Sequence, residues 1–110
     1  MSDLSPKAVA ALLRERDGVQ LVDVRRPDEH SAGRIAGSRH IELDLLPEEA
    51  VSLDREGPVV FYCRSGARSA LATQAFGAAG FEAHNLDGGL IAWVEQGLPI
   101  EPEGGQVAGH

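Results

Sequence analysis

The sequence has little cysteine: Cys63 is the only one among its 110 residues. A single cysteine excludes a disulfide within the chain and a zinc site built from several thiolates. It also leaves no second thiol to resolve an oxidised or sulfur-loaded Cys63. Any covalent reaction at this thiol must therefore be completed by a molecule or protein from outside the chain.

Basic residues and long apolar runs are scarce as well. Lys and Arg number 10 against 17 for Asp and Glu, which gives a net charge of −7. This balance argues against nucleic acid and acidic membrane surfaces as partners, because both attract a basic protein surface. No apolar run approaches the roughly 18 residues of a membrane span, and the first residues lack the features of a signal peptide. We expect a cytoplasmic protein with no nucleic-acid or membrane partner.

The histidines give no sign of a metal centre. His30, His40, His84 and His110 are scattered without ligand spacing, so we expect no metal and no other cofactor. Hydrophobic residues make up 43% of the sequence and charged residues 25%, which are the proportions of an ordinary globular protein. The sequence therefore predicts one folded domain.

Segments typical of strands and helices alternate along the chain. Strands are predicted over residues 19–24, 58–63 and 81–86, and helices over 6–16, 68–79 and the stretch after 87–89, with shorter helical turns at 27–31 and within 44–53. This alternation predicts an α/β fold over residues 4–100, with a mostly parallel central sheet and helices on both faces. The acidic, glycine-rich residues 101–110 are expected to be disordered. Gly77 costs its helix roughly 1 kcal/mol relative to Ala, so we expect it to relieve close packing.

Cys63 follows directly on the most apolar strand and begins a loop with the sequence Arg64-Ser65-Gly66-Ala67-Arg68-Ser69. In open α/β sheets, ligand sites form where a strand ends and runs through a loop into a helix. The helix start offers free N–H groups, Gly66 lets these groups turn inward, and Arg64 and Arg68 add positive charge. We expect these effects to lower the pKa of Cys63 and to attract a small oxyanion beside it.

The alternative is that Cys63 is an unreactive core residue, since free cysteines are often buried. However, no acidic residue lies between Pro58 and Gly80, so the only thiol of an acidic chain is expected to lie in a locally basic pocket. This charge pattern favours a reactive nucleophile over a structural cysteine.

The segment from Cys63 to Ser69 resembles the active-site loop of the rhodanese family of sulfurtransferases. Two further segments agree with this resemblance. The first family signature is matched by Leu21-Val22-Asp23-Val24-Arg25 with Glu29, Gly33, Ile35 and Gly37, and the C-terminal signature by residues 85–93 with Gly97 and Pro99. The likeness covers residues 4–100. Arg34 and His40 depart from the pattern, where the family often has His and Asn, but both lie outside the loop.

The resemblance implies that the Cys63 thiolate attacks the outer sulfur of a small anionic donor such as thiosulfate. The Cys63 persulfide is then held by N–H groups of the loop until cyanide or a thiol takes the sulfur. The implied substrate-binding residues are Arg64, Ser65, Gly66, Ala67, Arg68 and Ser69. Asp23 and Arg25 are candidates for the pocket wall, although we favour a structural ion pair between them.

Two alternative functions use the same thiol. One is a partner-dependent sulfur carrier, which takes sulfur from a sulfur-relay protein and delivers it to a thiolation or cofactor pathway. The other is a phosphatase or arsenate reductase of related fold, in which five residues separate the cysteine from an arginine. Only four residues lie between Cys63 and Arg68, and this tighter loop suits one added sulfur better than a phosphate. The phosphatase is therefore the weaker alternative.

Overall fold

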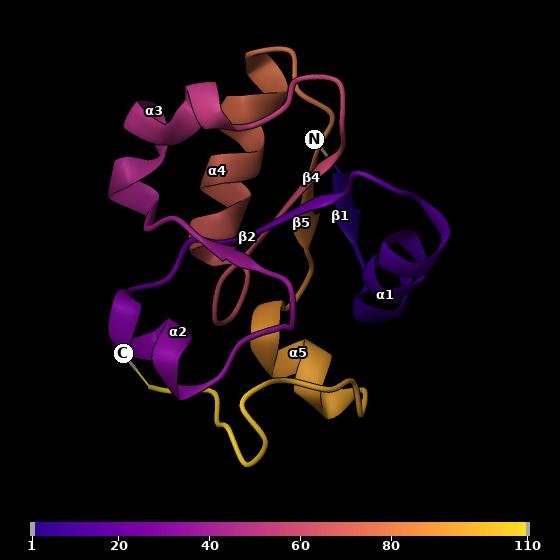
Figure 1. Ribbon diagram of the computed structural model, residues 1–110, viewed down its shortest axis with the longest axis vertical. Coiled ribbons are helices and arrows are strands. Elements are labelled where there is room, and N and C mark those ends of the chain that lie inside the picture. Colours follow the sequence, from indigo (N-terminus) through magenta and orange to yellow (C-terminus); the bar gives the residue numbers. More distant parts are fainter. Residues whose placement is uncertain (1, 110) are drawn as a thin grey trace.

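A five-stranded parallel sheet forms the centre of the structure, a computed structural model that describes residues 2–109. The strands lie in the order β1-β5-β4-β2-β3, and every neighbouring pair is parallel (Figure 1). Their bounds are β1 Ser2–Leu4, β2 Gln20–Asp23, β3 Arg39–His40, β4 Val59–Tyr62 and β5 Ala83–Leu86. The expected parallel α/β sheet is confirmed.

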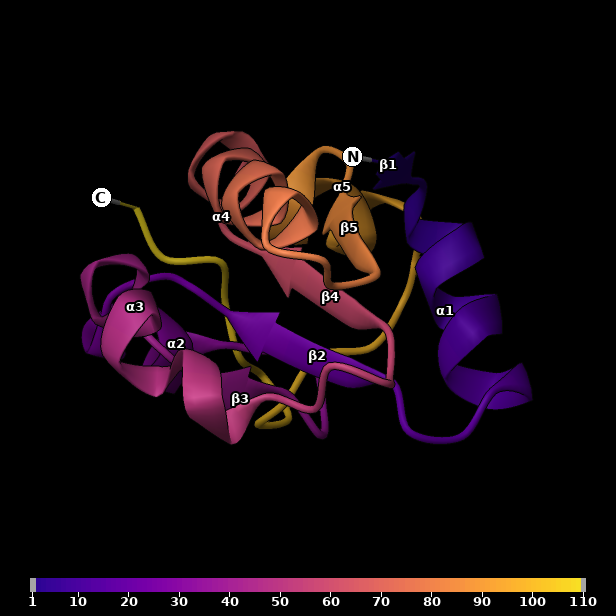
Figure 2. The same ribbon diagram turned by 90° about the horizontal axis from the view of Figure 1, so that it is seen from above.

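Helices cover both faces of this sheet. Their bounds are α1 Pro6–Glu15, α2 Pro27–Ala32, α3 Leu46–Glu49, α4 Ala67–Ala78 and α5 Gly89–Glu95. Residues of α1 and α5 belong to one hydrophobic cluster, and residues of α3 and α4 belong to the other. Figure 2 shows α1 and α3 at opposite sides of the strands.

Strand β4 lies in the middle of the sheet and explains the most apolar run of the sequence. Its residues alternate between the two clusters: Val59 and Phe61 pack toward α4, whereas Val60 and Tyr62 pack toward α1 and α5. All of these side chains are fully buried, as is typical of a parallel strand covered on both faces. The buried strand therefore fixes the position of Cys63 at its carboxyl end.

Two short strands and one helix boundary differ from the sequence-based prediction. β1 and β3 have three and two residues, too few to produce a periodic pattern. The helix expected within residues 44–53 is a one-turn α3 between two 3₁₀ turns, Leu43–Leu45 and Ala50–Ser52. The explanation of Gly77 is wrong, because a Cβ added there would meet nothing within 4 Å.

The C-terminal segment differs from the expectation of disorder over residues 101–109; residue 110 lies outside the described part. Glu101 and Arg34 exchange two backbone hydrogen bonds of 2.8 Å, and the N–H of Gln106 donates to Ala32 O at 2.8 Å. Val107 packs against the cluster beneath α1 and α5. Figure 1 shows this segment running from α5 back to α2. The glycine-rich composition of this segment gave no indication of these contacts.

Candidate active site

Cys63 lies immediately after β4, with only 1% of its surface exposed. Its Sγ accepts a hydrogen bond from the N–H of Gly66 at 3.1 Å and lies 3.4 Å from the hydroxyl of Ser69. Both partners belong to the loop that follows the thiol in the sequence. The loop thus folds around the sulfur atom, as the sequence predicts.

Gly66 makes this turn possible. It caps α4 in the left-handed region, with φ of 106°, a conformation that costs a residue with a side chain free energy. α4 begins at the next residue, Ala67, and has no acidic residue in its first turn. The free N–H groups of the helix start therefore meet a negative charge on Sγ favourably.

The first turn of α5 holds the loop from the other side. The N–H groups of Leu90 and Ile91 donate to the carbonyls of Cys63 and Arg64 at 2.9 and 3.1 Å. Gly89 permits this approach, since a Cβ there would lie 2.5 Å from Arg64 O. With these carbonyls turned toward α5, the following N–H groups are free to face the thiol.

Hydrogen bonds make the largest contributions that lower the pKa of the Cys63 thiol. Burial alone would raise the pKa of Cys63, but hydrogen bonds from the Ser69 hydroxyl and from the N–H groups of Ser69, Gly66 and Ser65 lower it below its ordinary value. The expected direction agrees, and so does the expected contribution of the loop N–H groups; the Ser69 hydroxyl, the largest contribution that lowers the pKa, was not part of the prediction. The sequence-based interpretation assigned part of this effect to Arg64 and Arg68.

Arg68 is held by a carboxylate that the sequence analysis did not assign to the site. Its guanidinium donates to both oxygens of Glu29, at 2.8 and 3.0 Å, and the Glu29 side chain is fully buried. Burial would raise the pKa of Glu29, but the bonds from Arg68 and from the N–H of Arg26 lower it to about 2. The predicted basic pocket is therefore largely neutralised at Arg68, because Glu29 reaches it from α2.

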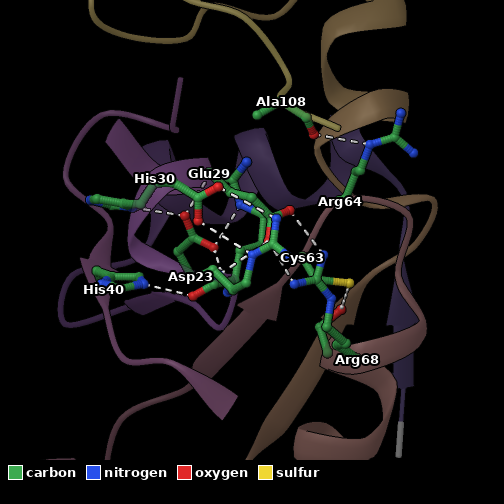
Figure 3. A network of polar contacts seen from close by, with 12 residues as sticks. Asp23, Glu29, His30, His40, Cys63, Arg64, Arg68 and Ala108 are labelled. Atoms are coloured by element: carbon green, nitrogen blue, oxygen red, sulfur yellow. Dashed lines mark hydrogen bonds and ion pairs between the residues drawn. The ribbon is translucent and has the colours of Figure 1, made fainter. Parts of the chain in front are cut away.

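Arg64 points away from the thiol. Its Nε donates to the carbonyl of Ala108 at 3.1 Å, and Figure 3 shows its side chain turned from Cys63 toward the C-terminal segment. Arg68 stays beside the sulfur in the same view. Of the two loop arginines, only Arg68 is placed to meet a substrate.

Asp23 and Arg25 form a buried ion pair and are not part of a pocket wall. Arg25 donates to both carboxylate oxygens of Asp23, at 2.8 and 2.7 Å, and to Gly33 O at 2.7 Å. Both side chains are fully buried. Burial opposes ionisation of Asp23, but the bonds from Arg25 and His30 lower its pKa. The ion pair confirms the structural interpretation, and the full burial of both side chains corrects the candidate pocket role.

A pocket of about 400 Å³ borders the loop and is the nearest space for a substrate. It is lined by Ser65, Ala67 and Arg68 from the loop, and by Val24, Arg26, Glu42, Leu43 and Asp44 from neighbouring segments. A larger, more apolar groove between α3 and α4 has no part in this chemistry. The pocket beside the loop has room for a small anion or for a thiol carried by a larger molecule.

Other polar groups give no separate site in the part of the chain that the structure describes. His30 and His40 stack with ring centroids 4.7 Å apart, and they bond to Asp23 and to Arg25 O. Between residues 2 and 109, no cluster of three or more His, Cys, Asp or Glu side chains is suited to a metal ion. Within the same range, no helix has the length and apolar character needed to cross a membrane.

Comparison with known proteins gives consistent matches. The family model of the rhodanese-like domain matches residues 5–96. A sulfurtransferase of Allochromatium vinosum is 36% identical over 106 residues, covering 94% of this chain and 99% of that protein. The thiosulfate sulfurtransferase GlpE of Pseudomonas paraeruginosa is 38% identical over 85 residues, covering 76% of each.

A solved structure agrees with the fold. The rhodanese-related protein of Thermoplasma volcanium superposes with a TM-score of 0.85 at 27% identity, covering 92% of this chain and 98% of that one. The family match extends over most of the sheet and includes the loop after β4, and the superposition covers nearly the whole chain. The chain therefore belongs to the rhodanese-like family of sulfurtransferases.

Proposed function

We propose that this protein transfers a sulfane sulfur from thiosulfate, or from another persulfide donor, to cyanide or a thiol through a persulfide on Cys63. The observation that carries the proposal is the position of the only thiol at the end of β4, with its Sγ 3.1 Å from the N–H of Gly66. A buried thiol with a lowered pKa and inward N–H groups is suited to attack on sulfur and to holding the anionic product.

In the first half-reaction, the thiolate Sγ attacks the outer sulfur of thiosulfate. The donor S–S bond breaks, sulfite leaves with the electron pair, and Cys63 carries a persulfide. The N–H groups of the loop stabilise the negative charge on the added sulfur. In the second half-reaction, cyanide attacks that sulfur, thiocyanate leaves, and the Cys63 thiolate returns. No net oxidant or reductant is needed.

The acceptor must come from outside the chain, because the sequence has no second cysteine. A free reactive thiol is maintained in a reducing compartment, so the proposal includes a cytoplasmic location. The same Cys63 persulfide serves both turnover with small molecules and sulfur transfer to a protein.

A second candidate function is the partner-dependent sulfur carrier, and the charges at the pocket favour it. Glu42 and Asp44 line the pocket, while Arg68 is paired with Glu29 and Arg26 forms bonds of 3.3 and 3.4 Å to Asp28. A pocket with paired arginines and additional carboxylates repels a dianion and attracts an acceptor thiol flanked by basic residues. This acceptor would be the cysteine of a sulfur-relay protein.

The deciding experiment is intact-mass measurement after brief exposure to thiosulfate. We expect the unmodified chain to gain the mass of one sulfur atom and Cys63→Ser to gain none, because the hydroxyl of serine is not ionised at neutral pH. A gain by both chains, or by neither while both remain folded, would contradict thiosulfate loading at Cys63. Turnover with thiosulfate and cyanide, compared with transfer to a protein thiol, then separates the enzyme from the obligate carrier.

A further inference from the structure

A chain of buried polar contacts leads from Cys63 through the helix start to the sheet. The hydroxyl of Ser69 lies 3.4 Å from Cys63 Sγ and 2.6 Å from Asn85 Oδ1. Asn85 lies on β5 and is only 4% exposed, while Ser69 is fully buried. No step of the sulfur-transfer reaction described above involves Asn85.

The orientation of the Asn85 amide follows from its other partners. Its Nδ2 donates to a carboxylate oxygen of Asp3 on β1 at 3.1 Å and approaches Gly66 O at 3.4 Å. Both partners are acceptors only, so the nitrogen must face them and the oxygen must face Ser69. The amide thus presents an acceptor, not a donor, to the hydroxyl beside the thiol.

The Ser69 hydroxyl has one hydrogen and three acceptors near it: Asn85 Oδ1 at 2.6 Å, Gly66 O at 3.3 Å and the sulfur of Cys63 at 3.4 Å. A hydroxyl donates to one acceptor well at a time. The 2.6 Å contact with Asn85 is a short bond between two oxygens, whereas 3.4 Å is an ordinary bond length to the larger sulfur atom, so Asn85 and Cys63 compete for one hydrogen. We propose that Asn85 is a positioning residue that competes with Cys63 for the Ser69 hydrogen and thereby limits the reactivity of the thiolate.

Charged groups are linked to this network and must stay unchanged in a test. They are Arg68 on α4, its partner Glu29 on α2, the Asp23–Arg25 pair after β2, and Asp3 on β1. Arg64 is turned toward Ala108. Asn85→Ala also removes the bond to Asp3, but this loss is the same with and without the Ser69 hydroxyl, so a shift that requires the hydroxyl arises from its hydrogen.

The test measures the rate of Cys63 alkylation by iodoacetamide from pH 5 to pH 10, followed by intact mass. Because Cys63 is the only cysteine, every adduct at a thiol reports on this residue. The measurement needs no sulfur donor, so its outcome is independent of the proposed sulfurtransferase activity. Circular dichroism of each variant confirms that it is folded.

We expect Asn85→Ala to move the midpoint of the pH–rate profile to lower pH, since the hydroxyl then donates to the thiolate. Below the midpoint the rate should rise about threefold, because the larger thiolate fraction is partly offset by lower nucleophilicity. Ser69→Ala should move the midpoint to higher pH. In the Ser69→Ala background, Asn85→Ala should produce no further shift.

Two results would overturn the proposal: an unchanged midpoint in Asn85→Ala, or an equal shift in the presence and absence of the Ser69 hydroxyl. The second would assign Asn85 a structural role only. If Asn85→Ala does not fold, Asn85→Leu, which removes the acceptor but keeps a similar side-chain volume, is measured with and without Ser69→Ala. The midpoint should fall only where the Ser69 hydroxyl is present, and an unchanged midpoint would refute the competition.

Discussion

Glu29 holds Arg68 beside the thiol from a fully buried position. Its carboxylate is fully enclosed and accepts two bonds from Arg68 and one from the N–H of Arg26. An ionised carboxylate in such a place is stable only while these donors surround it. Glu29 therefore links the fold of α2 to the position of Arg68 beside the thiol.

This link predicts a pH dependence of stability. The folded state lowers the pKa of Glu29 from 4.5 to about 2, so the unfolded chain binds the proton more readily. The stabilising contribution is present in full above the ordinary pKa and is lost as pH falls from about 4.5 toward 2. We expect the urea midpoint to fall steeply between pH 5 and pH 3, and less steeply in Glu29→Gln.

A matched control for this prediction is Glu49→Gln. Glu49 forms an ion pair of 3.0 Å with Arg39, but both side chains are nearly half exposed, and exposed pairs contribute little to stability. Its acid dependence should resemble that of the unmodified chain. Equal slopes in the Glu29→Gln and unmodified chains would show that Glu29 is not the carboxylate responsible.

The residues around the thiol divide into those that sequence could identify and those that it could not. Cys63, Gly66 and Ser69 lie within seven residues of one another in the loop and the first turn of α4, so their proximity follows from local geometry. Glu29 and Asn85 lie on other elements, and their contacts arise only when the sheet forms. Both belong to segments that resemble family signatures, but a signature does not say which side chain a residue contacts.

At the scale of elements, the start of α5 is a support for the loop. Gly89 has φ of 64° and lets its backbone lie against the carbonyls of Cys63 and Arg64. We expect Gly89→Ala to destabilise the protein by about 2 kcal/mol or more, through backbone strain and steric overlap. Sulfur loading from thiosulfate should fall more than tenfold, as measured by the rate of mass gain.

Gly77 provides the matched control glycine. It lies inside α4 with open space where a Cβ would be, so Gly77→Ala should stabilise the protein by about 0.5–1 kcal/mol. The rate of sulfur loading should not change. Normal stability and loading in Gly89→Ala would contradict the supporting role of α5.

The elements themselves were predictable to different degrees. β4 and α4 were predictable because a continuous apolar run and a helical spacing of alanines identify them. β1 and β3 were not, since so few residues show no alternation and gain their structure from neighbouring strands. The order of the strands likewise depends on pairings between distant segments.

At the scale of the whole molecule, the C-terminal segment connects the end of α2 with the loop after β4. It forms a bridge with Arg34, contacts the backbone at Gly33 and accepts a bond from Arg64 through Ala108. Deletion of residues 101–110 should lower the free energy of unfolding by about 1–2 kcal/mol, through lost hydrogen bonds and the exposure of apolar surface near Val107. Urea denaturation of the shortened chain measures this loss.

An unchanged urea midpoint in the shortened chain would restore the expectation of a disordered tail. The thiol offers a second readout, because without Ala108 the Arg64 side chain loses its carbonyl partner. The rate of Cys63 alkylation at a fixed pH, compared between the full and shortened chains, shows whether release of the Arg64 side chain changes the reactivity of the thiol.

The pairing of β1 with β5 also has a consequence for how the protein is made. Asp3 and Leu4 align with Asn85 and Leu86, so β1 has no partner strand until β5 has been synthesised. Pairings between such distant segments slow folding. The loop after Cys63 depends in the same way on α5, whose N–H groups bind its carbonyls, so the thiol acquires its surroundings only after both segments have been made.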